Sequence, residues 1–326
     1  MSLIKRFVKA SINAFGKLKA SLDEIVQDLI EAGRTESYAE TVGNKADTIH
    51  RRLKECSEND LKKAFEFNTR KAIKRMGLKK VVLGMDATKE LYFGRNGKLN
   101  VRQVKNEKGT TEAFAYLVLS VVEPKPLPLM AIPYRQGDDL TTLAKELLNY
   151  ARSLSLEIEV VLFDRGFYIW DLINYLSSAK MSYLIFVPQN KAMKKYIKQT
   201  NLIGSYEHIR KYNKCKSCFV GRTKIVVIKD LFRDKKDYFW CFATNLKQSI
   251  GLIGKYKQRW QIETDFRVQD EARIKTKSNI ALIRYFYFLA SLILLANWEV
   301  NRAIYPTVSF KRYLKIVEEQ FSNEIS

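Results

Sequence analysis

Two aspartates occupy places in the sequence where carboxylates are costly. Asp86 comes directly after the apolar run Val81–Met85, and Asp164 comes directly after Ile158–Phe163. A carboxylate at the end of a buried strand needs a partner, and two at matching ends of neighbouring strands repel one another unless a cation lies between them. Mg²⁺ is the expected cation because it prefers carboxylate oxygens and keeps water for a phosphate ligand. The alternative is that each aspartate caps the turn or helix after its strand.

A third acidic residue, Glu263, lies in a segment with helical spacing. Five polar side chains recur there at intervals that place them on one stripe of a helix: Tyr256, Arg259, Glu263, Arg267 and Asp270. A phenol, two guanidinium groups and two carboxylates are an unusual combination to bury without a function. The alternative is a surface ladder of ion pairs, Arg259 with Glu263 and Glu263 with Arg267, which contributes little stability.

The elements that must position these residues alternate between strands and helices. Apolar runs predict strands, and helical spacing predicts helices, in the order strand 81–85, strand 113–122, helix 139–152, strand 158–163, helix 168–179 and strand 182–187. This alternation predicts an α/β sheet, whose ligands bind at the carboxyl ends of its strands. Four of the six prolines fall in residues 124–133, which favours an edge or a connection there.

The overall charge points to a polyanionic partner. The chain has 57 Lys and Arg against 35 Asp and Glu, a formal charge of +22, and residues 187–236 alone carry a net charge of +11. Such a field attracts nucleic acid, or alternatively an anionic membrane surface. We interpret this block as an inserted β-rich module whose basic face contacts the DNA backbone. The lysines expected on that face are Lys191, Lys194, Lys195 and Lys198.

Residues 1–79 are expected to be a helical DNA-binding region. Within it, residues 37–42, the turn Gly43-Asn44 and residues 45–54 resemble a helix-turn-helix. Its second helix offers side chains suited to phosphates or base edges: Lys45, Thr48, His50, Arg51 and Arg52. An ordinary helical hairpin with a solvated basic face is the alternative.

Other features of the sequence exclude some classes of protein. Four cysteines are too few for a disulfide scaffold, and two histidines make chemistry based on histidine implausible. Cys215 and Cys218 have the spacing of half a zinc site, which His208 and Cys241 would have to complete. Residues 280–298 are apolar enough to span a bilayer, but we expect a buried core helix and no membrane contact.

The three acidic segments together resemble the DDE transposases of bacterial and archaeal insertion sequences. The third motif of this branch is Tyr-x2-Arg-x3-Glu-x6-Lys, which Tyr256, Arg259 and Glu263 match. The second is a strand-ending Asp-Arg-Gly-(Phe/Tyr), matched at residues 164–167, and Asp86 in Gly-Met-Asp-Ala-Thr matches the first. The chain departs from the pattern at Asp270, where Lys is expected.

The resemblance implies a catalytic core similar to RNase H, with a mixed sheet flanked by helices and interrupted by the β-rich insertion. The expected regions are 1–79 (DNA-binding), 80–186 (core, first part), 187–247 (insertion), 248–305 (core, second part) and 306–326 (tail). It further implies that Asp86, Asp164 and Glu263 are catalytic and hold two Mg²⁺, for which Mn²⁺ can substitute.

For the DNA, the resemblance implies that Arg259 holds a phosphate and that Tyr256 orients it. Arg267 and Arg165 are further candidates for phosphate contact. Phe167, Tyr168 or Trp260 could stack on an unpaired base, although core packing is the more ordinary role of each.

The predicted function is therefore Mg²⁺-dependent cleavage and strand transfer of the ends of an insertion sequence. The expected partners are terminal inverted repeats and target DNA, bound by a homodimer, with no small-molecule cofactor and a cytoplasmic, nucleoid-associated location. The alternatives are a transposase-derived DNA-binding protein that no longer cuts, and an RNase H-like nuclease that does not join strands.

Overall fold

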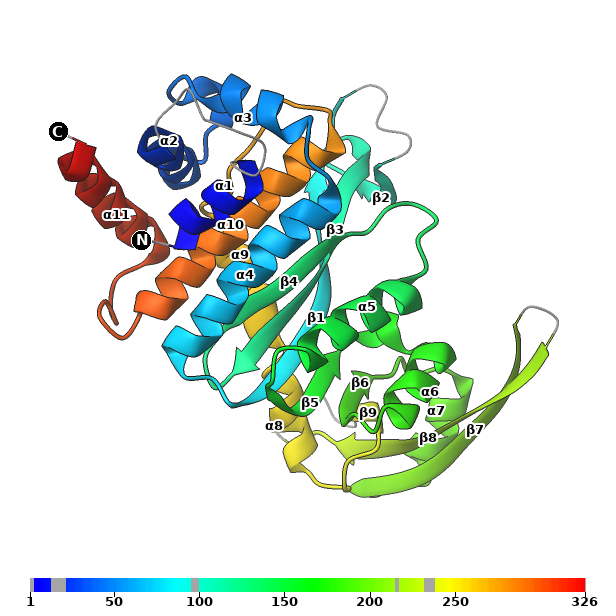
Figure 1. The fold of residues 1–326 in the computed structure, drawn as a ribbon. Helices are drawn as coiled ribbons and strands as arrows, with labels where there is room; N and C mark the ends of the chain where they lie inside the picture. The colour runs from blue at the N-terminus through cyan, green and yellow to red at the C-terminus, as the bar shows by residue number, and fades with distance from the viewer. Residues whose placement is uncertain (1–2, 13–21, 95–99, 215–216, 232–237, 326) are drawn as a thin grey trace.

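Figure 1 shows the protein as a computed structural model, which describes residues 3–12, 22–94, 100–214, 217–231 and 238–325. The strands are β1 (Lys80–Leu91), β2 (Arg102–Glu107), β3 (Thr110–Glu123), β4 (Leu127–Pro133), β5 (Glu157–Phe163), β6 (Tyr183–Phe186), β7 (Ile203–Lys214), β8 (Ser217–Lys229) and β9 (Phe239–Thr244). The α-helices are α1 (Leu3–Ile12), α2 (Leu22–Thr35), α3 (Ala46–Leu53), α4 (Glu58–Met76), α5 (Leu140–Arg152), α6 (Trp170–Ser178), α7 (Lys191–Lys198), α8 (Gly251–Lys257), α9 (Trp260–Asp270), α10 (Ala281–Asn301) and α11 (Phe310–Ile325). The short 3₁₀ helices are η1 (Ala39–Thr41) and η2 (Arg165–Phe167).

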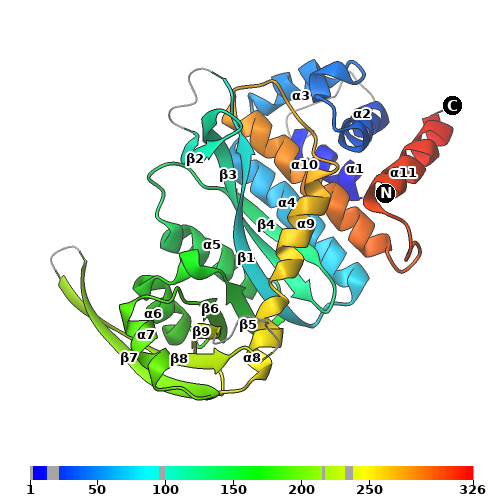
Figure 2. The same ribbon diagram turned by 180° about the vertical axis from the view of Figure 1, so that it is seen from behind.

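One mixed sheet organises these elements. Its strands follow the order β2-β3-β1-β5-β6-β9-β8-β7, and β4 pairs with β3 beside this path. β1, β5 and β6 are parallel, whereas β3 is antiparallel to β1 and β9 is antiparallel to β6. Figure 1 shows α4 and α5 over one face, and Figure 2 shows α8 and α9 over the opposite face. The predicted mixed α/β class with a helical N-terminal region is confirmed.

β1 is longer than the sequence predicted, because its two neighbours pair with different parts of it. The parallel pairing with β5 ends at Met85, whereas the antiparallel pairing with β3 continues to Leu91. Asp86 therefore lies within β1 and does not terminate it. It does follow the fully buried stretch Val81–Met85, so the predicted change from apolar to polar surroundings occurs at that residue.

Residues 187–247, predicted as a β-rich insertion, do not form a sheet of their own. β8 pairs with β9 and β9 pairs with β6, so the long β7–β8 hairpin continues the central sheet. Figure 1 shows the long strands β7 and β8 extending past the helices. The sequence pattern does not predict β7, because the segment from Ile203 to Lys214 is largely polar and contains no apolar run.

The predicted helix-turn-helix is wrong in its first helix. Only the 3₁₀ turn η1 forms there, whereas α3 forms as predicted. Backbone hydrogen bonds instead tie the start of this segment to the chain after α9: Ala39 donates to the Lys275 carbonyl at 2.8 Å, and Lys275 donates to the Ser37 carbonyl at 3.3 Å. Pairing with a distant segment has replaced local helix formation.

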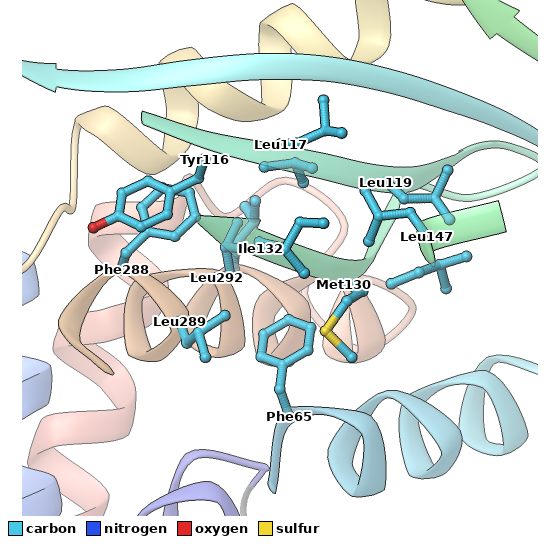
Figure 3. Packing of buried hydrophobic residues seen from close by; sticks show 14 of the residues in the cluster. Phe65, Tyr116, Leu117, Leu119, Met130, Ile132, Leu147, Phe288, Leu289 and Leu292 are labelled. Atoms are coloured by element: carbon cyan, nitrogen blue, oxygen red, sulfur yellow. The ribbon is translucent and has the colours of Figure 1, made fainter. Parts of the chain in front are cut away.

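α10 is the central core helix. Figure 3 shows Leu289 and Leu292 of this helix against Phe65 of α4 and Ile132 of β4. By length and composition α10 could cross a membrane, but 83% of its most apolar window is buried inside the protein. The prediction of a buried core helix over residues 280–298 is confirmed, and burial of so many apolar side chains ties the N-terminal helices to the sheet.

Gly43, just before α3, packs closely against Asp28. Its φ is 57°, and a Cβ there would lie 2.2 Å from the Asp28 carboxylate, which accepts a hydrogen bond from the Lys45 backbone N–H at 3.2 Å. We expect Gly43→Ala to lower the free energy of unfolding by about 2–3 kcal/mol, because backbone strain adds to displacement of Asp28.

Urea denaturation measures this decrease, and Gly77→Ala is the matched control. Gly77 has a φ of 64° with nothing within 4 Å of an added Cβ, so only the backbone strain remains. Equal decreases in the two variants would contradict the proposed clash with Asp28.

Candidate active site

The register of two parallel strands places Asp86 and Asp164 at the same level. Gly84 pairs with Leu162, and Met85 pairs with Phe163, so the next positions along the two strands are the two aspartates. Side chains alternate between the faces of a sheet. Asp164 is therefore in phase with Leu162, which packs in the apolar cluster beneath α8 and α9. Both aspartates belong to the face that α8 and α9 cover.

Two features hold α8 and α9 against this face. The Tyr256 ring packs against the rings of Phe186, Trp240 and Phe242, with centroid distances of 5.7, 5.9 and 5.2 Å. Ile262 of α9 packs in the apolar cluster on this face beside Val82 of β1 and Val122 of β3. Figure 2 shows both helices on this side of the sheet.

Arg259 joins the acidic residues into one cluster. Its guanidinium donates to Asp86 Oδ2 at 2.9 Å through Nη1 and to Glu263 Oε1 at 2.6 Å through Nη2. Its Nε donates to the Tyr256 hydroxyl oxygen at 3.2 Å, and that hydroxyl donates to Asp164 Oδ1 at 3.4 Å. The three acidic residues singled out from the sequence therefore converge on one Tyr–Arg pair.

Burial and neighbouring charges shift the pKa values of the side chains in this cluster. Burial raises the pKa of Asp86; the Ala87 backbone N–H and Arg259 oppose that rise, while the charges of Asp164 and Glu263 add to it. Burial also raises the pKa of Tyr256, so its hydroxyl keeps its proton and can donate. For Arg259, burial works against the charge, but the surrounding tyrosine and carboxylates outweigh it and raise the pKa. The cluster thus holds a permanent cation among competing anions.

The cluster opens to solvent at one end. The Glu263 side chain is 54% exposed, whereas the Asp86 side chain is 22% exposed and that of Arg259 only 6%. Further along α9, Arg267 is exposed, and Asp270 forms an ion pair with Arg273 at 2.5 Å. The position at which a Lys was expected is therefore held by an acid already paired with a neighbouring arginine.

The donor chemistry of the cluster fits a hard divalent cation, because all three acids offer carboxylate oxygens. In the present arrangement, however, no group of three or more His, Cys, Asp or Glu side chains among the described residues is placed to hold a metal ion. Arg259 contacts two of the carboxylates and supplies the positive charge itself. A metal ion at Asp86 and Glu263 would have to compete with that guanidinium.

The residues predicted to contact DNA lie in several places. Arg165 is exposed directly after Asp164, and Arg51 is exposed on α3, whereas Arg52 is half-buried. The α7 lysines are all exposed: Lys191, Lys194, Lys195 and Lys198. His50, predicted on the same face as Arg51, instead contacts the Tyr287 hydroxyl at 3.1 Å and faces the core helix α10.

The predicted stacking residues and the zinc alternative can also be placed. Phe167 is buried at 4% exposure, whereas Trp260, beside Arg259, is 47% exposed and accessible for stacking. Of the zinc candidates, Cys215 and the side chain of Cys218 lie outside the described residues. His208 contacts the Tyr196 hydroxyl at 3.0 Å, and Cys241 is buried in β9.

Comparisons with known proteins agree with this fold and identify the family. The transposase DDE domain family matches residues 102–297, a range that contains Asp164, Arg259 and Glu263 and begins after Asp86. Because the match spans more than half of the chain, the chain belongs to the transposase DDE domain family. Members of this family generally use divalent metal ions.

A solved structure shares the fold at low sequence identity. It is the cryo-EM structure of a piggyBac transposase synaptic complex with hairpin DNA, with a TM-score of 0.59 and 12% identity. The alignment covers 98% of this chain and 77% of that one. No curated protein matches the chain in sequence.

The family motif implies that Arg259 contacts a DNA phosphate, and nothing in the sequence pattern predicts its contact with Asp86. The spacing of Arg259 and Glu263, four residues apart on a helix, did signal their ion pair. The contact with Asp86 depends on how close α9 lies to β1, which helical spacing alone does not reveal.

Asp265 lies on the buried side of α9, and its burial should make the stability of the fold depend on pH. Its side chain accepts from Gln261 Nε2 at 2.8 Å. Burial, reinforced by the charge of Glu299 and opposed by Gln261 and Arg302, raises its pKa from 3.8 to about 7. The folded state therefore favours the protonated form, and stability should fall as pH rises from about 4 to about 7.

We expect Asp265→Asn to remove this fall, so that at pH 8 the variant is more stable than the wild type by about 2–4 kcal/mol. Urea denaturation at pH 4 and pH 8 measures it, with Glu271→Gln, an exposed position just after α9, as the control. A variant that keeps the pH dependence of the wild type would contradict the assignment to Asp265.

Proposed function

We propose that this protein cuts the ends of its own insertion sequence and joins them to target DNA in a reaction that requires Mg²⁺. Membership of the transposase family supplies the class of reaction. The observation that carries the specific proposal is the convergence of Asp86, Asp164 and Glu263 on the Tyr256–Arg259 pair. These three acidic side chains come from separate parts of the chain, and their negative charges repel one another. Clusters of interacting ionisable groups with shifted pKa values are concentrated at functional sites.

In this proposal Asp86, Asp164 and Glu263 hold the divalent ions. When bound, the ions would activate a water or a 3′-hydroxyl as nucleophile and stabilise the leaving oxygen. The protein's own groups position the DNA: Arg259 binds a phosphate oxygen beside the broken bond, and the Tyr256 hydroxyl orients that phosphate by donating a hydrogen bond. Arg165 and Arg267, both exposed near the cluster, extend the phosphate contacts along the strand.

DNA is the proposed partner because of charge and exposure. The net charge of +22 supplies long-range attraction, and the exposed lysines of α7 supply a local basic surface. The structure with a similar fold is itself a complex with hairpin DNA. We further propose that two copies act together, because two element ends must be joined, and that the protein works in the cytoplasm at the nucleoid.

One observation favours a second candidate, a transposase-derived protein that binds DNA without cutting it. Asp270 replaces the Lys expected in the third motif and pairs with Arg273, so an acid occupies the position where that cation is expected. A nuclease on the same core that does not join strands is the remaining alternative. Incubation of labelled element ends with Mg²⁺ separates all three candidates. The transposase yields joined products, the DNA-binding protein yields no products, and the nuclease yields cleaved products only.

Replacing any one of the three acids should abolish the chemistry. We expect Asp86→Asn, Asp164→Asn and Glu263→Gln each to lower the cleavage rate on the order of 10³-fold, because each would remove a charge that holds the ions. Glu271→Gln, an exposed glutamate just after the same helix, is the matched control and should cleave at the wild-type rate. Cleavage unaffected by Asp164→Asn would sink the proposed metal-binding role.

The lysines of α7 should contribute to the salt dependence of DNA binding. Replacing Lys191, Lys194, Lys195 and Lys198 by Ala should flatten the slope of log K against log salt by about 0.9 for each phosphate that the variant no longer neutralises. Fluorescence anisotropy with duplex DNA at low and at high salt measures the slope. The control replaces four exposed lysines outside residues 1–79 and 187–247, namely Lys105, Lys125, Lys311 and Lys315. An equal change of slope in both variants would contradict a specific contact of α7 with DNA.

A further inference from the structure

Arg259 is held in a way that conflicts with its proposed role on DNA. The residue is only 5% exposed, and its guanidinium donates to Tyr256, Asp86 and Glu263, all inside the cluster. One guanidinium supplies one positive charge, yet here it serves two carboxylates directly. While it does so, it cannot donate the same N–H groups to a DNA phosphate.

The same contacts oppose metal binding. Nη1 and Nη2 lie at hydrogen-bond distance from Asp86 Oδ2 and Glu263 Oε1, which are carboxylate oxygens of two of the acids proposed to hold the ions. A cation that approaches them meets the repulsion of the guanidinium and must replace its hydrogen bonds.

We propose that Arg259 is an internal latch, which pairs with Asp86 and Glu263 in the DNA-free protein and keeps their affinity for divalent ions low until a DNA phosphate draws the guanidinium away. This inference rests on the proposed function and adds a mode of regulation to that site. Occupation of the metal site and of the phosphate site is then positively coupled, because both require Arg259 to leave the carboxylates.

The surroundings of Arg259 permit such a movement. α8 ends at Lys257 and α9 begins at Trp260, so Arg259 lies at the interruption between two helices. Its partner Glu263 is on the open side of the cluster, with a side chain 54% exposed. By turning toward solvent and an incoming phosphate, the guanidinium would give up its hydrogen bond to the Tyr256 hydroxyl and its place over the Tyr256 ring. The contacts of that ring with Phe186, Trp240 and Phe242 do not involve Arg259.

The test measures binding of Mn²⁺ to the DNA-free protein by the decrease in the electron paramagnetic resonance signal of free Mn²⁺. We expect Arg259→Gln to bind Mn²⁺ about tenfold more tightly than the wild type, because the ion no longer competes with a guanidinium. Arg70→Gln is the matched control: Arg70 also pairs with a glutamate four residues away on a helix, at 2.7 Å, but outside the cluster. Its Mn²⁺ affinity should equal that of the wild type.

A second measurement guards against a folding defect in the variant. Without metal, Arg259→Gln should melt at a lower temperature than the wild type because the carboxylates lack their counter-charge, and Mn²⁺ should raise its melting temperature by more than it raises that of the wild type. Arg259→Lys, which keeps the charge but lacks the planar fork of donors with which the guanidinium spans two carboxylates, should lie between the two.

The outcomes separate the latch from the function on which it rests. Equal Mn²⁺ affinity in the wild type and Arg259→Gln would overturn the latch alone. Failure of both proteins to bind Mn²⁺ would overturn the proposed metal site, and the latch with it.

Discussion

The structure of the site depends on bringing three carboxylates together without their mutual repulsion pushing the helix off the sheet. Arg259 resolves that conflict, because one buried guanidinium contacts Asp86 and Glu263 and reaches Asp164 through the Tyr256 hydroxyl. A buried ion pair is stabilising only when its partners are well placed and hydrogen-bonded. The strands and helices around the cluster hold Arg259 within hydrogen-bond distance of its partners and so meet that condition.

That placement comes from apolar packing. The parallel register of β1 and β5 aligns the two aspartates, and Ile262 of α9 packs in the apolar cluster beside β1. The aromatic rings around Tyr256 hold that residue in place. On the other side of the sheet, α10 is buried along most of its length and supports the strands. The polar cluster is thus held by elements whose own stability owes little to charge.

The sequence was sufficient to predict the scaffold and the acids but not their contacts. Apolar runs predicted β1, β3, β5 and β6 because those strands are buried, whereas β7 is largely polar and depends on its pairing with β8. The first helix predicted before Gly43 does not form because that segment pairs with Lys275, a partner more than 200 residues away. The link between Arg259 and Asp86 was missed for the same reason, since it spans 173 positions in the chain.

We expect Arg259 and Asp86 to form one energetic unit, and a double-mutant cycle on the free energy of unfolding measures the coupling between them. The cycle compares Asp86→Asn, Arg259→Gln and the double variant with the wild type in urea denaturation at neutral pH. The account predicts a coupling energy of about 1–3 kcal/mol, because each single change leaves a buried group without its partner. Effects of the two substitutions that simply add would contradict it.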